Sequence, residues 1–166
     1  MLTIYLSEYE LYDEYNNKFH TYPSINVDLE HSLVSLYKWE ARWHIPFLNV
    51  KEFTTEQYLF YIKCMILNTP SEPTFINGLT QDNIKEIQTY IADPMTATVI
   101  SEHSKKETSF IKKSIVTAEV IYAQMIANNI PFECQHWHLN QLICLINTCD
   151  AKNNPKKLLN KKIPLR

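Results

Sequence analysis

Thiol and imidazole side chains gather in one stretch of this sequence, and their types would suit a zinc site. Cys134, His136 and His138 lie within five residues, and Cys144 and Cys149 follow. Zinc sites take pairs of ligands from turns, whereas the two later cysteines fall within a predicted helix. On a helix, residues two apart also point to different sides. We therefore expect no metal or other cofactor, and Cys134, His136 and His138 remain only weak metal candidates.

Residue types for covalent and acid–base catalysis are present, but no pattern joins them. A nucleophile needs a base beside it, and Cys64 and the six histidines form no recognisable local signature. The acidic pairs Glu8 with Glu10 and Asp13 with Glu14 fall in a polar segment. We interpret these pairs as solvated charge rather than as a general acid and base.

A single glycine, Gly78, occurs in the 166 residues, and this excludes several classes of site. Phosphate-binding loops, dinucleotide-binding folds and nucleophile elbows need glycines where the backbone turns tightly or approaches a ligand. One glycine cannot build any of them, so we predict that the protein is not an enzyme.

Large aromatic side chains favour binding to another protein. The three tryptophans, Trp39, Trp43 and Trp137, belong to the residue type most enriched at binding hot spots. The alternative interpretation is that they anchor the core, as most tryptophans of a small domain do. We expect the protein-binding surface to include Trp39, Trp43, Phe47, Phe132 and Trp137.

The charge of the chain is nearly balanced in total and uneven along its length. The net charge is −2, which attracts neither nucleic acid nor an acidic membrane. Seven acidic residues lie between Met1 and Glu40, whereas residues 151–166 carry six basic residues and no acid. That basic segment allows contact with an acidic partner, and a solvated, frayed terminus is the alternative. It has neither the arginine content nor the interleaved aromatic residues typical of nucleic-acid binding, so we expect no nucleic-acid partner.

The cysteines and the apolar runs bear on the compartment. The four cysteines lack a disulfide-rich spacing, and no basic region precedes an apolar run at the N-terminus, as a signal peptide would require. No apolar stretch approaches the roughly 20 residues needed to span a bilayer. We therefore expect reduced cysteines in a cytosolic protein with no membrane contact.

The elements that must position these residues begin with two candidate strands. Leu2 to Leu6 alternates apolar and polar residues, and Ser24 to Ser35 repeats the alternation, ending with Leu33 and Val34. The two segments would pair as a small antiparallel sheet. We predict no secondary structure for the polar, tyrosine-rich stretch between them, up to Pro23.

Helical periodicity replaces the alternation after the second strand. Thr54 with Gln57 three positions later is a capping-box pattern, and Thr80 is a predicted N-cap. Met95 to Ile100 is predicted to be extended, and Ser101 to Thr108 to be a loop. The predicted helices run from Ser35 to before Pro46, from Thr55 to about Leu67, from Thr80 to Asp93, from about Ser114 to Ala127 and from about Gln135 to Thr148.

Together these elements predict an α+β fold that is mostly helical, with four or five helices and a small N-terminal antiparallel sheet. Residues 1–150 would form a single globular domain, and residues 151–166 a basic, flexible tail. The predicted core consists of Leu36, Trp39, Trp43, Phe47, Ile62, Ile66, Ile87, Ile91, Ile121, Met125, Leu139, Leu142 and Ile146.

Three segments of the chain form a specific set. They are His31 to Glu40 (HSLVSLYKWE) with Ile45 to Leu48 (IPFL), Pro94 to Thr98 (PMTAT), and Ile130 to Leu139 (IPFECQHWHL). The set resembles a family of small proteins encoded in the structural-gene clusters of tailed bacteriophages, over about residues 29–154. The resemblance implies a role like that of tail assembly chaperones, which bind the helical tape-measure protein and keep it soluble until tail tubes polymerise.

We therefore hypothesise a tail assembly chaperone-like protein in the cytoplasm of an infected bacterial host, with tail proteins such as the tape-measure protein as its partners. The runner-up is a structural protein of the neck or tail that stays in the virion. A third hypothesis, from another class, is a small metal-dependent nucleic-acid-binding protein or enzyme. Self-association into a homo-oligomer is left open.

Overall fold

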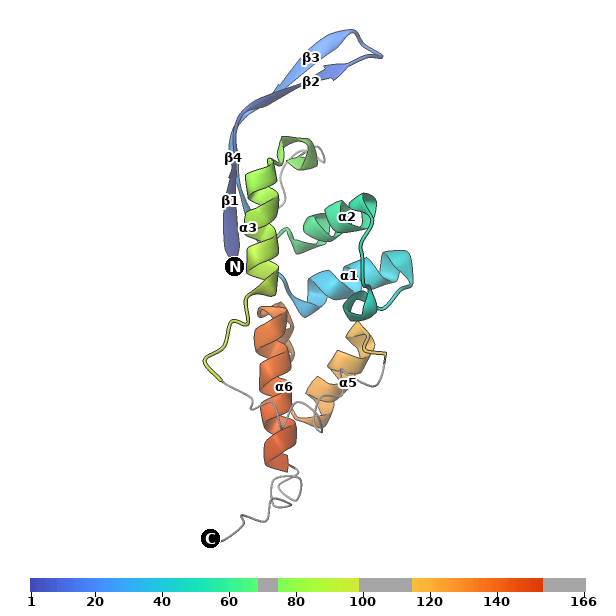
Figure 1. The fold of residues 1–166 in the computed structure, drawn as a ribbon, viewed down its shortest axis with the longest axis vertical. Coiled ribbons are helices and arrows are strands. Elements are labelled where there is room, and N and C mark those ends of the chain that lie inside the picture. Colours follow the sequence, from blue (N-terminus) through green and yellow to red (C-terminus); the bar gives the residue numbers. More distant parts are fainter. Residues whose placement is uncertain (69–74, 99–114, 154–166) are drawn as a thin grey trace, which may run out of the picture. The chain divides into compact units, whose positions relative to one another are not determined.

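The structure, a computed structural model, describes residues 1–68, 75–98 and 115–153 (Figure 1). In these ranges it contains five α-helices and two antiparallel two-stranded sheets near the N-terminus, which confirms the predicted α+β, mostly helical fold. The chain groups into two compact units. Unit 1 is residues 1–31 and 52–93, and unit 2 is residues 32–51 and 94–166. The segment 1–150, expected to be one domain, is thus built from two units that interleave along the chain.

The N-terminal strands of unit 1 form one long hairpin, residues 2–29, called the arm below. Strand β1 (Leu2–Leu6) pairs with β4 (Ile25–Leu29), as predicted, and β2 (Tyr9–Asp13) pairs with β3 (Lys18–Tyr22). The residue numbers of every pair add up to 31 in both ladders, so the register continues without a bulge across the interruption. Pro23 lies at that interruption and has no N–H to donate to a ladder. Figure 1 shows the arm as a continuous blue ribbon.

The two helices of unit 1 begin where local hydrogen bonds start them. Helix α2 (Thr55–Met65) and helix α3 (Gln81–Ala92) each begin with a capping box, formed by Thr54 with Gln57 and by Thr80 with Asn83. Both boxes satisfy N–H groups that the first helical turn leaves without partners. Helix α3 packs against β1. The buried residues of unit 1 include Ile4, Leu6, Ile62, Met65 and Ile87.

Two buried polar side chains of unit 1, Glu30 and His31, have hydrogen-bond partners. The Glu30 carboxylate accepts a hydrogen bond from the Tyr90 hydroxyl at 2.6 Å and lies 2.7 Å from the amino group of Met1. Burial, and then the neighbouring Glu30, raise the pKa of Tyr90, so its hydroxyl keeps its proton. The His31 Nδ1 atom lies 2.5 Å from the hydroxyl of the buried Tyr61, and burial raises the pKa of that tyrosine well above its ordinary value.

The only glycine of the chain lies at a close approach between two parts of unit 1. Gly78 ends the short helix η2 (Phe75–Gly78), and its φ is not positive. A Cβ atom there would lie 2.6 Å from Cε1 of Tyr9. The ring of Tyr9 in turn stacks on Tyr22, with centroids 5.0 Å apart. Gly78 therefore makes room for the Tyr9 ring at the start of the β2–β3 ladder.

Unit 2 is helical. Helix α1 (Leu33–Trp43) begins two residues earlier than predicted, so Leu33 and Val34 belong to it and not to a strand. It ends at His44, which adopts the left-handed conformation before Pro46 is reached. The remaining elements are η1 (Phe47–Asn49), α5 (Ala118–Ala127), η4 (Phe132–His136) and α6 (Leu139–Asn153).

Several predicted boundaries in unit 2 are displaced. Residues 115–117 precede α5 rather than starting it, and residues 135 and 136 belong to η4 instead of the last helix. Helix α6 continues to Asn153, so residues 151–153, which were predicted to belong to the tail, are helical. Residues 95–98 form no strand, and Met95 has a positive φ. The predicted loop 101–108, residues 99 and 100, and tail residues 154–166 lie outside the described residues.

None of the helices in the described ranges is both long and apolar enough to cross a membrane.

Candidate functional site

Helix α5 carries apolar side chains on more sides than its own core contact requires. Ala118, Ile121 and Met125 are buried, whereas Tyr122 is half-buried and Ile126 is 62% exposed. A helix that is apolar all round is normally enclosed on every side. In this structure α5 instead shows part of its apolar surface, as a helix that binds a partner would.

Three aromatic side chains from three different elements form a row beside α5. Tyr37 comes from α1, Tyr122 from α5 and Phe132 from η4. The ring centroids of Tyr37 and Tyr122 lie 6.3 Å apart in an edge-to-face arrangement, and those of Tyr122 and Phe132 also lie 6.3 Å apart. Tyr37 is 46% exposed and Phe132 is 53% exposed. These three residues are called the aromatic face below.

The hydroxyl group of Tyr122, the central ring of the aromatic face, is fixed by a hydrogen bond. The Tyr122 hydroxyl donates a hydrogen bond to Oε1 of Gln135 at 2.9 Å. Burial, and then the neighbouring Tyr37, raise the pKa of Tyr122, so its hydroxyl stays protonated and remains a donor. The aromatic face is therefore made of neutral rings, of which the middle one is fixed in orientation.

The packing of α1 brings the three rings together. Helix α1 contacts both α5 and η4. Its Leu36 and Trp39 side chains are fully buried, while Tyr37 lies on its outer side. Since both neighbouring elements pack against this one helix, Tyr37, Tyr122 and Phe132 lie on a common support.

A buried carboxylate fixes the start of α5. Glu40 of α1 accepts a hydrogen bond from the backbone N–H of Ala118 at 2.7 Å and another from that of Phe47 at 2.8 Å. Ala118 is the first residue of α5, and the side chain of Thr117 before it makes no capping bond. Burial raises the pKa of Glu40, and the two N–H groups oppose that shift. Glu40 therefore acts as the N-terminal cap of α5, supplied by another helix.

The predicted binding residues divide between the interior and the surface. Trp39 and Phe47 are buried and Trp43 is half-buried. The Trp39 ring lies 5.1 Å from that of Phe47 and 6.3 Å from that of Trp43. This cluster supports α1 and offers little contact area to a partner. Phe132 is exposed and belongs to the aromatic face, and Trp137 is 41% exposed at the residue that follows η4.

Two residues of the aromatic face, Tyr37 and Tyr122, were not among the predicted binding residues. Tyr37 lies off the stripe formed by Leu36 and Trp39, which is a signal for an outward-facing ring. The signal for Tyr122 is the nearly unbroken apolar composition of residues 118–127.

The weak metal candidates are not brought together as a site. Cys134 and His138 are buried, and His136 is exposed. The Nδ1 atom of His138 accepts a hydrogen bond from the backbone N–H of Asn140 at 3.3 Å, at the start of α6. Burial raises the pKa of the Cys134 thiol, which disfavours the thiolate that binds metal. Among the residues that the structure describes, no three His, Cys, Asp or Glu side chains are grouped so that they could hold a metal ion.

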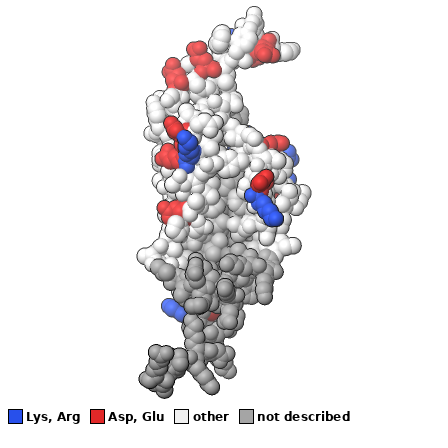
Figure 2. Space-filling view, viewed as in Figure 1, with Lys and Arg blue, Asp and Glu red and all other residues white. Residues whose placement is uncertain are grey.

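Charged side chains of the described residues are scattered on the face shown in Figure 2, and both signs occur. One ion pair of the described residues is Lys85 with Asp82 in α3, whose Nζ and Oδ1 atoms lie 3.6 Å apart. Both side chains are largely exposed, so the pair contributes little to stability. The aromatic face is thus the feature of the described surface with the clearest binding chemistry.

Comparison of the chain with protein-family models, with curated proteins and with solved structures finds no match.

Proposed function

We propose that this protein binds an apolar helical segment of another protein through the aromatic face. The observation that carries the proposal is the row of Tyr37, Tyr122 and Phe132 on a support of packed helices, in which the two outer rings are exposed and the middle ring is half-buried. Aromatic rings supply a large contact area with few rotatable bonds, which keeps the entropy cost of binding low.

The spacing of the rings suits a helix as the occupant. Successive centroids lie 6.3 Å apart, and side chains three or four residues apart on a helix are separated by about 6 Å. An amphipathic helix laid along the row would place one apolar side chain near each gap between rings, as in other complexes in which a helix fills an apolar groove.

The biological setting that we propose is bacteriophage tail assembly, with the tape-measure protein as partner, in the cytoplasm of the infected host. It rests on the resemblance of the three segments given above. A long helical protein exposes apolar stripes until it is packed into the tail, and a chaperone that covers such stripes needs a binding surface and no catalytic residues.

The test is co-expression of the tape-measure protein with the full chain or with a variant that lacks the outer rings. In Tyr37→Ser/Phe132→Ser we expect the soluble fraction of the tape-measure protein to fall toward its level without the chain, because losing two anchors weakens binding at least about tenfold. The matched control is Tyr12→Ser/Phe19→Ser, which removes an equally exposed Tyr–Phe pair from the arm. If the control has the same effect, or if solubility never depends on the chain, the proposal is wrong.

The runner-up, a virion component of the neck or tail, differs in where the protein is found after assembly. Mass spectrometry of purified virions should detect no copy of a chaperone. Detection in a constant copy number would replace the chaperone proposal with the structural one.

A further inference from the structure

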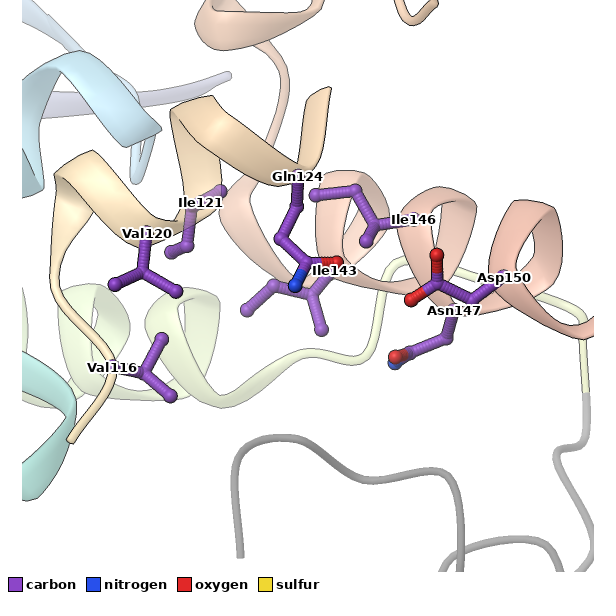
Figure 3. A pocket seen from close by; sticks show the side chains of 8 residues that line it. All are labelled: Val116, Val120, Ile121, Gln124, Ile143, Ile146, Asn147 and Asp150. Carbon is purple, nitrogen blue, oxygen red and sulfur yellow. The ribbon is translucent and has the colours of Figure 1, made fainter. Parts of the chain in front are cut away.

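A second apolar surface of unit 2, distinct from the aromatic face, is a groove between α5 and α6 (Figure 3). Val120 and Ile121 line it from α5, and Ile143 and Ile146 line it from α6. Two of its polar residues, Asn147 and Asp150, lie along α6 toward the end of that helix, and the third, Gln124, belongs to α5.

The groove and the aromatic face use different sides of α5. Val120 and Gln124 are four residues apart and share the groove side. Tyr122 and Ile126 are likewise four apart, on the other side of the same helix. An occupant of the groove therefore leaves the aromatic face open, and an inference about the groove does not depend on the proposed function.

We propose that the C-terminal segment of the same chain, residues 154–166, occupies this groove. Helix α6 ends at Asn153, one turn beyond Asp150, so the segment starts at the polar end of the groove. The side-chain amide of Asn153 also donates a hydrogen bond to Asn128 Oδ1 at 3.0 Å, which holds the end of α6 beside the end of α5.

The length of the segment is sufficient for it to return along the groove. The stretch of α6 from Asp150 back to Ile143 spans about 10 Å, at roughly 1.5 Å per residue. Residues 154–159 alone reach up to about 20 Å when extended, at roughly 3.3 Å per residue. Pro155 comes two residues after Asn153, and because proline disfavours a continued helix, the sequence allows the chain to turn back there.

The order of residue types along the segment matches the order of residue types along the groove. Lys156 and Lys157 come first, and Leu158 and Leu159 follow. Starting from the end of α6, the segment would bring its basic pair past Asp150, the one charged residue in the described lining, and then its apolar pair to the isoleucine and valine side chains. The whole segment contains no acidic residue.

Hydrogen exchange of the full chain measures whether the segment covers the groove. In Leu158→Asp/Leu159→Asp we expect amides of residues 118–124 and 143–150 to exchange about tenfold faster, since burial of even one leucine is worth about that factor. The matched control, Asn160→Asp/Lys161→Asn, changes the net charge equally but keeps both leucines, and should exchange like the unmodified chain. Equal exchange in all three proteins, or an equal increase in both variants, would overturn the proposal.

A photo-crosslink identifies the occupant. With Val120→p-benzoylphenylalanine, we expect irradiation to attach residues 154–166 to α5 within a monomer. Attachment of residues 99–114, or a crosslinked band at the mass of two chains, would show a different occupant and overturn the proposal.

Discussion

Two regions of the molecule expose aromatic rings, and they differ in what supports them. The rings of the aromatic face stand on α1, α5 and η4, and both α5 and η4 pack against α1, whose Trp39 is buried. The rings of Tyr12 and Phe19 stand on the β2–β3 ladder, to which no third strand of the described residues is hydrogen-bonded. Their centroids lie 4.9 Å apart, so the arm pairs its rings with each other.

This difference indicates which of the two regions already has an ordered backbone before a partner binds. An isolated two-stranded ladder is only marginally stable in water, so a partner of the arm would have to meet the cost of ordering it. The aromatic face needs no such ordering, because Glu40 and the packed helices already hold the backbone beneath it. All three tryptophans belong to unit 2. Tryptophan fluorescence therefore follows unit 2, and hydrogen exchange follows the arm.

The largest expected effect comes from removing the buried carboxylate under the aromatic face. Glu40→Ala leaves the N–H groups of Phe47 and Ala118 without their acceptor, and we expect the free energy of unfolding to fall by about 3 kcal/mol. Urea denaturation followed by tryptophan fluorescence measures it. The exposed Lys38→Ala on the same helix is the control and should stay within about 0.5 kcal/mol. A loss for Glu40→Ala that is no larger than the control would contradict the support assigned to this residue.

A smaller effect is expected where the arm meets η2. In Gly78→Ala the new methyl group would overlap the Tyr9 ring, which is held by its stack on Tyr22, and we expect a cost of about 1 kcal/mol. Amides of β2 and β3 should exchange faster, while the tryptophan-detected midpoint stays unchanged. Asn77→Ala, the exposed neighbour, is the control. A shift in the tryptophan-detected midpoint would contradict this prediction, because it would show that the arm and the aromatic face do not unfold independently.

A still smaller effect is expected from one ring of the arm. Phe19→Thr keeps a residue suited to strands but removes the cross-strand contact with Tyr12, which is worth about 0.5 kcal/mol. Hydrogen exchange should accelerate in β2 and β3 and remain unchanged in β1 and β4. Tyr15→Thr, at a turn residue that is 96% exposed, provides the baseline. If the two variants behave alike, the Tyr12–Phe19 contact contributes nothing.

The smallest effect is the pH dependence of Glu40. Burial raises the pKa of this carboxyl above its ordinary value, so the folded state binds its proton more tightly than the unfolded state does. Its contribution to stability is therefore greatest in acid and declines as the pH rises through the raised pKa. Compared with Glu40→Gln, which does not titrate, the wild-type advantage should be larger at about pH 4 than at about pH 7. Urea denaturation at both pH values measures this difference in the free energy of unfolding. An advantage of the wild type that grows with pH would contradict the prediction.

Local signals predicted the helices of unit 1 well. The capping box at Thr54 and the N-cap at Thr80 are present as predicted, and Asn83 completes a second box at Thr80 that was not predicted. Such a cap is a set of hydrogen bonds within four residues. Asn129, two residues past the end of α5, has a φ of 52°, a left-handed conformation that asparagine adopts in place of glycine after a helix. Such features depend little on the rest of the chain.

The distal half of the arm was missed, and its residues explain why. Neither face of β2–β3 is buried, so the apolar alternation that marks a half-buried strand is weak there. The turn between them contains no glycine. Asn17 takes the positive φ instead, and the Asp13 carboxylate accepts hydrogen bonds from the N–H groups of Tyr15 and Asn16.

Taken by itself, the sequence determined where α2 and α3 begin and which residues, such as Ile62, Ile87 and Leu139, must be buried. It did not decide which aromatic rings reach the surface. Trp39 and Phe47 are covered, whereas Tyr37 and Tyr122 are left partly open. Caps and periodicity act within a turn or two of the chain. The exposure of a ring depends on elements that arrive from far along it, as Ala118 reaches Glu40 from 78 residues away, and only the tertiary structure brings these together.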